Sequence, residues 1–211
     1  MTTFQDRKRP IVLGVAIIAM AFAAAARAQS EADAGIEAVW KPHRVNFVYH
    51  GYSTLYSCQS LQHKLERILL TVGAHGDLAL RTYACDNLTG TARFQIAMES
   101  PVAATPENIR ELTTHGSQDV LIARVRGEDL PSAEDVQRFP AVWKTVSFGR
   151  DRRMRLAPGD CELVRALQRQ ILPRMSVQVV SNNVRCSVYG NITSPRLVVS
   201  ALVPAKTALT D

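Results

Sequence analysis

Apolar and polar residues follow the same order twice along this chain, and the order predicts a strand, a helix and two further strands. In its first occurrence, residues 45–49 have the β-branched and aromatic composition of a strand. Apolar residues then recur at helical spacing from Cys58 to Val72. Residues 78–83 and 91–98 follow as two strands, and the turn residues between them predict a hairpin.

The second occurrence begins its helix 103 residues later, counted from Cys58 to Cys161. Its elements are a strand at 143–148, a helix at 161–172 and strands at 176–186 and 196–203. We therefore expect an α+β fold of two tandem, pseudo-duplicated βαββ units, over residues 45–100 and 141–204. Since the strands that flank each helix should run parallel and the hairpin adds an antiparallel strand, we expect a mixed sheet with helices mainly on one face.

A segment of different composition, residues 101–140, connects the two units. Thr105 and Pro106 are a capping residue and a first-turn proline, so they predict a helix start. The β-branched run at 119–126 predicts a strand. Ser132 is expected to open a short helix that ends before Pro140.

Four cysteines occupy equivalent places in the two units. Cys58 and Cys161 each open a helix, while Cys85 and Cys186 each close the strand that follows it. A helix of 14 residues rises about 20 Å, and a strand of seven or eight residues returns a similar distance. The chain geometry thus predicts the disulfides Cys58–Cys85 and Cys161–Cys186. The alternative, a redox site, would require a Cys-x-x-Cys motif or a lone activated thiol, and the sequence has neither.

The first 28 residues have the pattern of a signal peptide. A basic start at residues 7–9 precedes an apolar run from Ile11 to Ala26, and Ala26 and Ala28 are the small residues that signal peptidase selects. Such a short, alanine-rich signal is typical of bacteria. We expect Sec-type export to the periplasm or medium with cleavage near Ala28, no transmembrane segment in the mature chain, a flexible leader over 29–44 and a tail over 205–211.

The net charge of the chain is lower once the predicted signal peptide is left out. The full chain has 25 basic and 19 acidic residues, a net charge of +6. The first 28 residues hold four basic side chains and one acidic side chain, a net charge of +3, so the rest carries 6 − 3 = +3. A net charge of this size does not indicate a nucleic-acid-binding protein. The expected partner is an envelope protein or an anionic polymer.

Histidines gather in the first unit and offer a candidate metal site. Zinc and copper favour imidazole ligands. The alternative is that these histidines are ordinary surface residues, since none has helical i, i+4 spacing with another. The candidate ligands are His43, His50, His63 and His75.

Two further groups could bind a ligand. A dense basic run could recognise an anionic partner, or it could be a solvated connection before the second helix; it consists of Arg150, Arg152, Arg153 and Arg155. Aromatic residues around the end of the first strand could line a pocket, or they could pack the sheet edge; they are Tyr49, Tyr52 and Tyr56, with His50 beside them.

Signatures of known catalytic classes are missing from the sequence. Residues 51–55 lack the final glycine of a nucleophile elbow, because Leu55 stands in its place, and the chain contains neither a phosphate-binding loop nor a dinucleotide-binding glycine pattern. We therefore expect a non-catalytic binding or interaction module of the cell envelope, with no cofactor. The alternatives are a zinc- or copper-binding protein that uses the four histidines, or a small envelope enzyme with a pocket near His50.

Overall fold

The structure, a computed structural model, describes residues 35–86, 88–187, 189 and 194–205. The predicted signal peptide and nearly all of the predicted tail lie outside this range. No helix among the described residues is long and apolar enough to cross a membrane.

The first half contains the elements expected from the hydrophobic pattern. They are β1 (Ile36–His50), α2 (Cys58–Thr71), β2 (Ala79–Asp86) and β3 (Thr91–Ala103). Ser57 caps α2, since its hydroxyl accepts a hydrogen bond from the Ser60 amide at 3.2 Å. Gly73, with φ of 102°, then ends the helix in the left-handed conformation that favours glycine.

The second half has the same order of elements. They are β4 (Arg138–Ser147), α5 (Cys161–Gln170), β5 (Val177–Asn183) and β6 (Arg196–Pro204), with short 3₁₀ turns η1 (Pro158–Asp160) and η2 (Leu172–Arg174) on either side of α5. Between the halves lie α3 (Pro106–Thr113) and α4 (Ser117–Arg126). The fold is α+β, as expected.

The six strands of the described residues form one sheet in the order β2-β3-β1-β4-β6-β5, and every neighbouring pair is antiparallel. The prediction of a mixed sheet is therefore wrong. β1 and β2 do run in the same direction, but β3 lies between them and pairs with both. In the second half, β6 lies between β4 and β5 in the same way.

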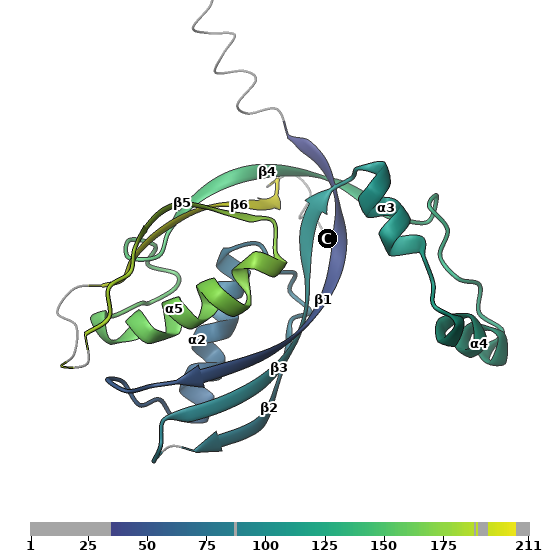
Figure 1. The fold of residues 1–211 in the computed structure, drawn as a ribbon. Coiled ribbons are helices and arrows are strands. Elements are labelled where there is room, and N and C mark those ends of the chain that lie inside the picture. The colour runs from purple at the N-terminus through teal and green to yellow at the C-terminus, as the bar shows by residue number, and fades with distance from the viewer. Residues whose placement is uncertain (1–34, 87, 188, 190–193, 206–211) are drawn as a thin grey trace, which may run out of the picture. The chain divides into compact units, whose positions relative to one another are not determined.

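The two halves of the sheet join through a short contact. β1 pairs with β4 only from Ile36 to Val39, while β1 continues to His50 beside β3. Figure 1 shows the two groups of strands separating beyond this junction, with α2 and α5 between them. One apolar core fills that space, and its central side chains include Phe47, Leu65, Phe94 and Leu167.

Three local predictions need correction. Residues 119–126 form part of helix α4 instead of a strand, because the Asp119 carboxylate caps the Gly116 amide and Gly127 closes the helix with φ of 66°. Residues 132–137 contain turns, and the predicted helix there is not formed. Residues 36–44, expected in a flexible leader, lie in β1, where Ala38 and Val39 are buried.

Both predicted disulfides are confirmed. Cys58 is bonded to Cys85 with a Cα–Cα separation of 6.0 Å, and Cys161 is bonded to Cys186 with a separation of 5.5 Å. Each bridge joins the start of a helix to the segment at the end of the next strand. Both therefore fix a helix against the edge of the sheet.

Candidate functional site

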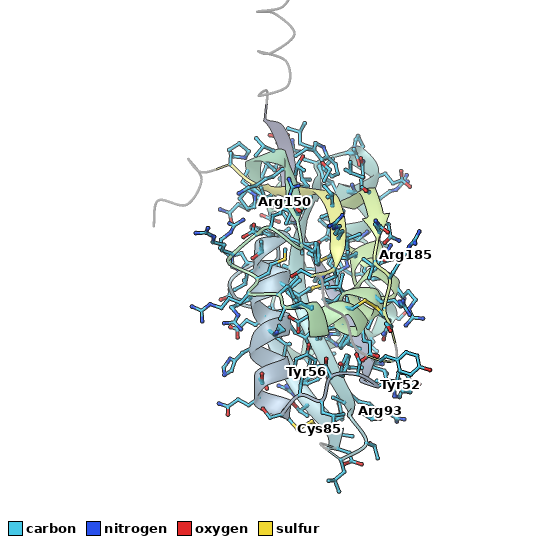
Figure 2. The ribbon with its side chains drawn as sticks, turned by 90° about the vertical axis from the view of Figure 1, so that its left-hand side faces the viewer. Tyr52, Tyr56, Cys85, Arg93, Arg150 and Arg185 are labelled. Carbon is cyan, nitrogen blue, oxygen red and sulfur yellow. A yellow bond between two sulfur atoms is a disulfide. The ribbon has the colours of Figure 1, made fainter. Side chains whose placement is uncertain are left out.

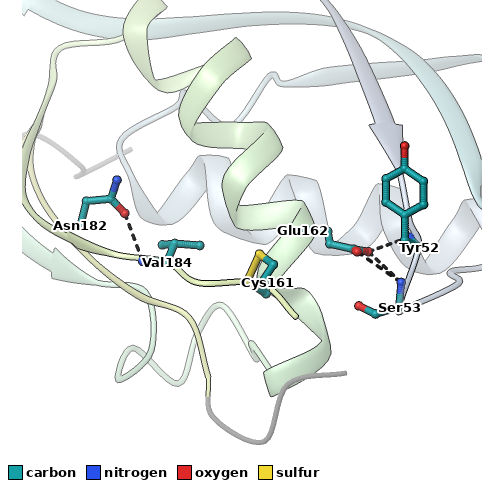
Figure 3. Close-up of a disulfide and its surroundings, with 7 residues drawn as sticks. Tyr52, Ser53, Cys161, Glu162, Asn182 and Val184 are labelled. Carbon is teal, nitrogen blue, oxygen red and sulfur yellow. Dashed lines mark hydrogen bonds between the residues drawn. A yellow bond between two sulfur atoms is a disulfide. The ribbon is translucent and has the colours of Figure 1, made fainter. Parts of the chain in front are cut away.

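The loop after β1, residues 51–57, is held by the start of α5 in the other half of the chain. The Glu162 carboxylate accepts hydrogen bonds from the Tyr52 amide at 2.8 Å and the Ser53 amide at 3.2 Å. Figure 3 shows this contact beside the disulfide of Cys161, with the Tyr52 ring directed away from Glu162. The second disulfide and the loop thus share one anchoring point on α5.

A buried ionic network lies beneath this loop. The Asp160 side chain is 2% exposed and receives the Lys64 ammonium at 2.7 Å, where the Lys64 side chain is 13% exposed. Asp160 also accepts hydrogen bonds from the Tyr56 hydroxyl and from the Ala157 amide, the latter at 2.6 Å. Because Lys64 and Tyr56 belong to the first half and Asp160 to the second, the network joins the two halves through the core.

Tyr49 and Tyr56 are packed together beside the network. Their ring centroids are 5.4 Å apart, and the Tyr49 hydroxyl donates a hydrogen bond to the Thr54 carbonyl at 2.9 Å. Burial and the nearby carboxylates of Glu162 and Asp160 raise the pKa of Tyr49. Burial and the hydrogen bond to Asp160 raise the pKa of Tyr56 still further.

These shifts predict a split tyrosine titration. At about pH 11 the folded protein should keep Tyr49 and Tyr56 protonated and so ionise at most three of its five tyrosines, whereas the chain unfolded in urea should ionise all five. Since the folded state keeps two protons that the unfolded state loses, the free energy of unfolding should fall as the pH rises above about 10. Tyrosinate absorbance against pH, with and without urea, measures the number of ionised tyrosines in the unfolded and the folded protein. Five ionised tyrosines in the folded protein would contradict the burial of Tyr49 and Tyr56 beside Asp160.

A groove lies between β1 and α5, where β1 has separated from β4. It comprises a cavity of about 450 Å³ beside Val48, His50 and Tyr52 and another of about 400 Å³ beside Arg44 and Asn46. Arg169 and Gln170 line both cavities, so the two cavities adjoin. The Gln170 amide receives the Val48 N–H at 2.9 Å and donates to the Val48 carbonyl at 2.8 Å. It thereby holds α5 beside the strand.

Arginine side chains supply the charge of the groove. Arg165 and Arg169 come from α5, Arg174 from η2 and Arg44 from β1. None of the four forms an ion pair with a carboxylate of the described residues. The one acidic side chain in the lining is that of Glu162, which already accepts the two loop amides.

Arg174, at the far end of the groove, also acts on His43 of β1. Burial and the nearby Lys41 and Arg174 lower the pKa of His43, while Glu111, which pairs with Lys41 at 2.6 Å, raises it. Unpaired guanidinium groups along a concave surface bind carboxylates and phosphates through charge-assisted hydrogen bonds. The arrangement is therefore suited to holding an anionic ligand.

The aromatic pocket predicted from sequence is divided by the structure. His50 and Tyr52 line the groove, whereas Tyr49 and Tyr56 are packed in the core beneath the loop. Figure 2 shows Tyr52 at the surface near the end of the molecule that carries Cys85. The sequence analysis missed Arg165 and Arg169, whose i, i+4 spacing on the predicted helix was an available signal.

The four candidate metal ligands are not brought together. Each imidazole has a separate neighbour: Ser100 for His43, Thr91 for His50, Glu66 for His63 and Asp77 for His75. Within the described part of the chain, no group of three or more histidine, cysteine, aspartate or glutamate side chains is placed to hold a metal ion.

The predicted basic run from Arg150 to Arg155 forms an exposed loop away from the groove. Arg153 pairs with Asp151 at 2.5 Å, and the fully buried Met154 anchors the loop in the core. Figure 2 shows Arg150 well separated from Tyr52. The run and the groove are therefore two distinct basic surfaces.

Comparisons with known proteins found no matching family model, no matching curated protein and no matching solved structure.

Proposed function

We propose that this protein is an exported, non-catalytic binding module of the bacterial cell envelope and that it holds an anionic ligand in the groove between β1 and α5. The observation that carries the proposal is the row of four arginines without carboxylate partners among the described residues. The ligand class is a carboxylate- or phosphate-bearing partner, such as an acidic envelope protein or an anionic polymer.

Export is supported by two independent features. The N-terminal sequence has a basic start, an apolar run and a cleavage motif. The two disulfides fit an oxidising compartment outside the cytoplasm, where such bridges persist. A binding module in the periplasm or medium would have access to acidic polymers of the envelope.

We also infer that the two βαββ halves arose by duplication, which makes the groove's charge informative. When the sequence of α2 is aligned with that of α5 at Cys58 and Cys161, Gln62 corresponds to Arg165 and Glu66 corresponds to Arg169. A helix in this position therefore does not need arginines to pack against the sheet. Among the two helices, the arginine pair is specific to α5, which supports a binding role over a packing role for Arg165 and Arg169.

The test is retention on an immobilised polyanion such as heparin. Changing Arg165 and Arg169 to glutamate should weaken binding by about tenfold or more per arginine, because each charge-assisted hydrogen bond contributes roughly 1.5–3 kcal/mol. The matched control is the same change at Arg150 and Arg152, which lie outside the groove. Equal retention of the groove variant and the wild-type protein would refute the proposal, and weaker retention of the control alone would move the site to the 150–155 loop.

A further inference from the structure

Helix α4 carries an apolar surface that the rest of the described structure does not cover. Leu121 is 59% exposed, Ile122 41% and Val125 87%, while Ala123 is the one buried residue of the helix. Leu121, Ile122, Val125 and Arg126 line a shallow depression. Figure 1 shows α4 in the segment that joins β3 to β4, away from α2 and α5.

The exposure belongs to a well-terminated helix. The Asp119 carboxylate accepts the Gly116 amide at 3.0 Å, and Gly127 ends the helix in the left-handed conformation with its amide on the Arg124 carbonyl at 3.4 Å. Helical spacing then places Leu121 and Val125, which are four residues apart, on one face, with Ile122 next to them. We call the three side chains Leu121, Ile122 and Val125 the α4 stripe.

Charged residues border the α4 stripe in a self-complementary order. Asp119, Ile122 and Arg126 are spaced by three and four residues, so they form one row along the helix. The acidic residue is in the first turn and the basic residue in the last turn. In an antiparallel pair of α4 helices centred between Ile122 and Ala123, Asp119 of each copy lies opposite Arg126 of the other. A parallel pair would place like charges together.

We propose that α4 docks against α4 of a second copy of this chain and forms an antiparallel, two-fold symmetric dimer. In such a dimer the α4 stripe packs against its own counterpart, and both ends of the charged row are matched. Arg126 is available for this pairing, because its ion pair with Glu128 is long, at 3.9 Å, and both side chains are about two-thirds exposed. The α4 stripe and the groove share no residue.

The contact between two α4 helices is small, so the dimer should be weak. Stable interfaces bury roughly 1,200–2,000 Å², more than a pair of ten-residue helices provides. The dimer should therefore exchange with the monomer and have a dissociation constant on the order of micromolar or weaker. Dimerisation should depend steeply on protein concentration.

Sedimentation equilibrium of the exported chain, up to about 1 mM, measures this association. Changing Val125 to aspartate should abolish it, and Asp119→Arg or Arg126→Asp should each weaken it by about tenfold, because two attractive pairs become repulsive. Mixing the two charge variants should restore association, since the all-basic row of the first variant is complementary to the all-acidic row of the second. Circular dichroism checks that each variant is folded.

The mixing experiment separates docking from local damage. Asp119 also caps the helix, so the single variant could weaken dimers by unwinding α4. Unwinding would not be corrected by adding the Arg126→Asp chain, whereas complementary charge would be. A wild-type protein that stays monomeric, an unaffected Val125→Asp variant or a mixture no stronger than its components would overturn the proposal. Monomers that bind anionic lipid vesicles through Val125 would instead assign the α4 stripe to a membrane surface.

Discussion

Replacing Asp160 with alanine is expected to lower the free energy of unfolding by about 3–5 kcal/mol, because it removes one partner of a buried ion pair. The Lys64 ammonium, only 13% exposed, would lose its carboxylate partner, and the Tyr56 hydroxyl and the Ala157 amide would lose their acceptor. Urea unfolding followed by fluorescence measures the loss. The midpoint should fall without a large change in the slope.

A double-mutant cycle separates the ion pair from the other contacts of Asp160. The change Lys64→Met removes the cation but keeps an unbranched side chain, and the double variant lacks both charges. We expect the double variant to be destabilised by less than the sum of the two single variants, since neither charge is then left buried without its partner. Additive effects would mean that the 2.7 Å contact between Lys64 and Asp160 contributes no coupling.

The disulfides and most elements could be predicted because local geometry determines them. A helix that starts at Cys58 and a strand that ends near Cys85 return the chain to its starting point whichever strands pair. The order of the strands in the sheet, by contrast, is not determined by local geometry. A hairpin can place either of its strands beside β1, and the connection alone does not decide between the two arrangements.

A signal for the observed order was nevertheless available. The sequence of β3 alternates apolar residues such as Phe94 and Ile96, which are buried in the core, with polar ones such as Arg93, whereas β2 has fewer large apolar residues and is mostly exposed. A strand with few buried residues belongs at the edge of a sheet, so β3 is the better central neighbour for β1. The prediction of a mixed sheet was wrong because it assumed that the two strands flanking each helix are neighbours and did not consider this difference in composition.

The groove and α4 could not be predicted for other physical reasons. Arg165 and Arg169 lie on the polar side of a predicted helix, but their importance depends on β1 separating from β4 beside them. In α4, the Val120–Ile122 run favours a strand, and the caps at Gly116 and Gly127 outweigh that preference. The groove thus depends on strand pairing far along the chain, whereas α4 depends on the capping residues that flank the run.

Removing the Cys161–Cys186 disulfide is expected to cost more stability than removing the Cys58–Cys85 disulfide. The loops they close are nearly equal, 25 and 27 residues, so loop entropy assigns each about 3 kcal/mol. Cys161 is fully buried, whereas Cys58 and Cys85 are partly exposed, so its change to alanine adds a small cavity that costs roughly 1 kcal/mol more.

The contacts around Cys161 increase this difference. Its neighbours Asp160 and Glu162 hold Lys64 and the loop amides of Tyr52 and Ser53, so a looser start of α5 weakens both. Urea unfolding of the Cys161→Ala/Cys186→Ala and Cys58→Ala/Cys85→Ala proteins provides the comparison. Equal losses would show that loop closure alone determines the contribution of each disulfide, and a larger loss for the first pair would show that the bridge also positions the start of α5 against the loop after β1.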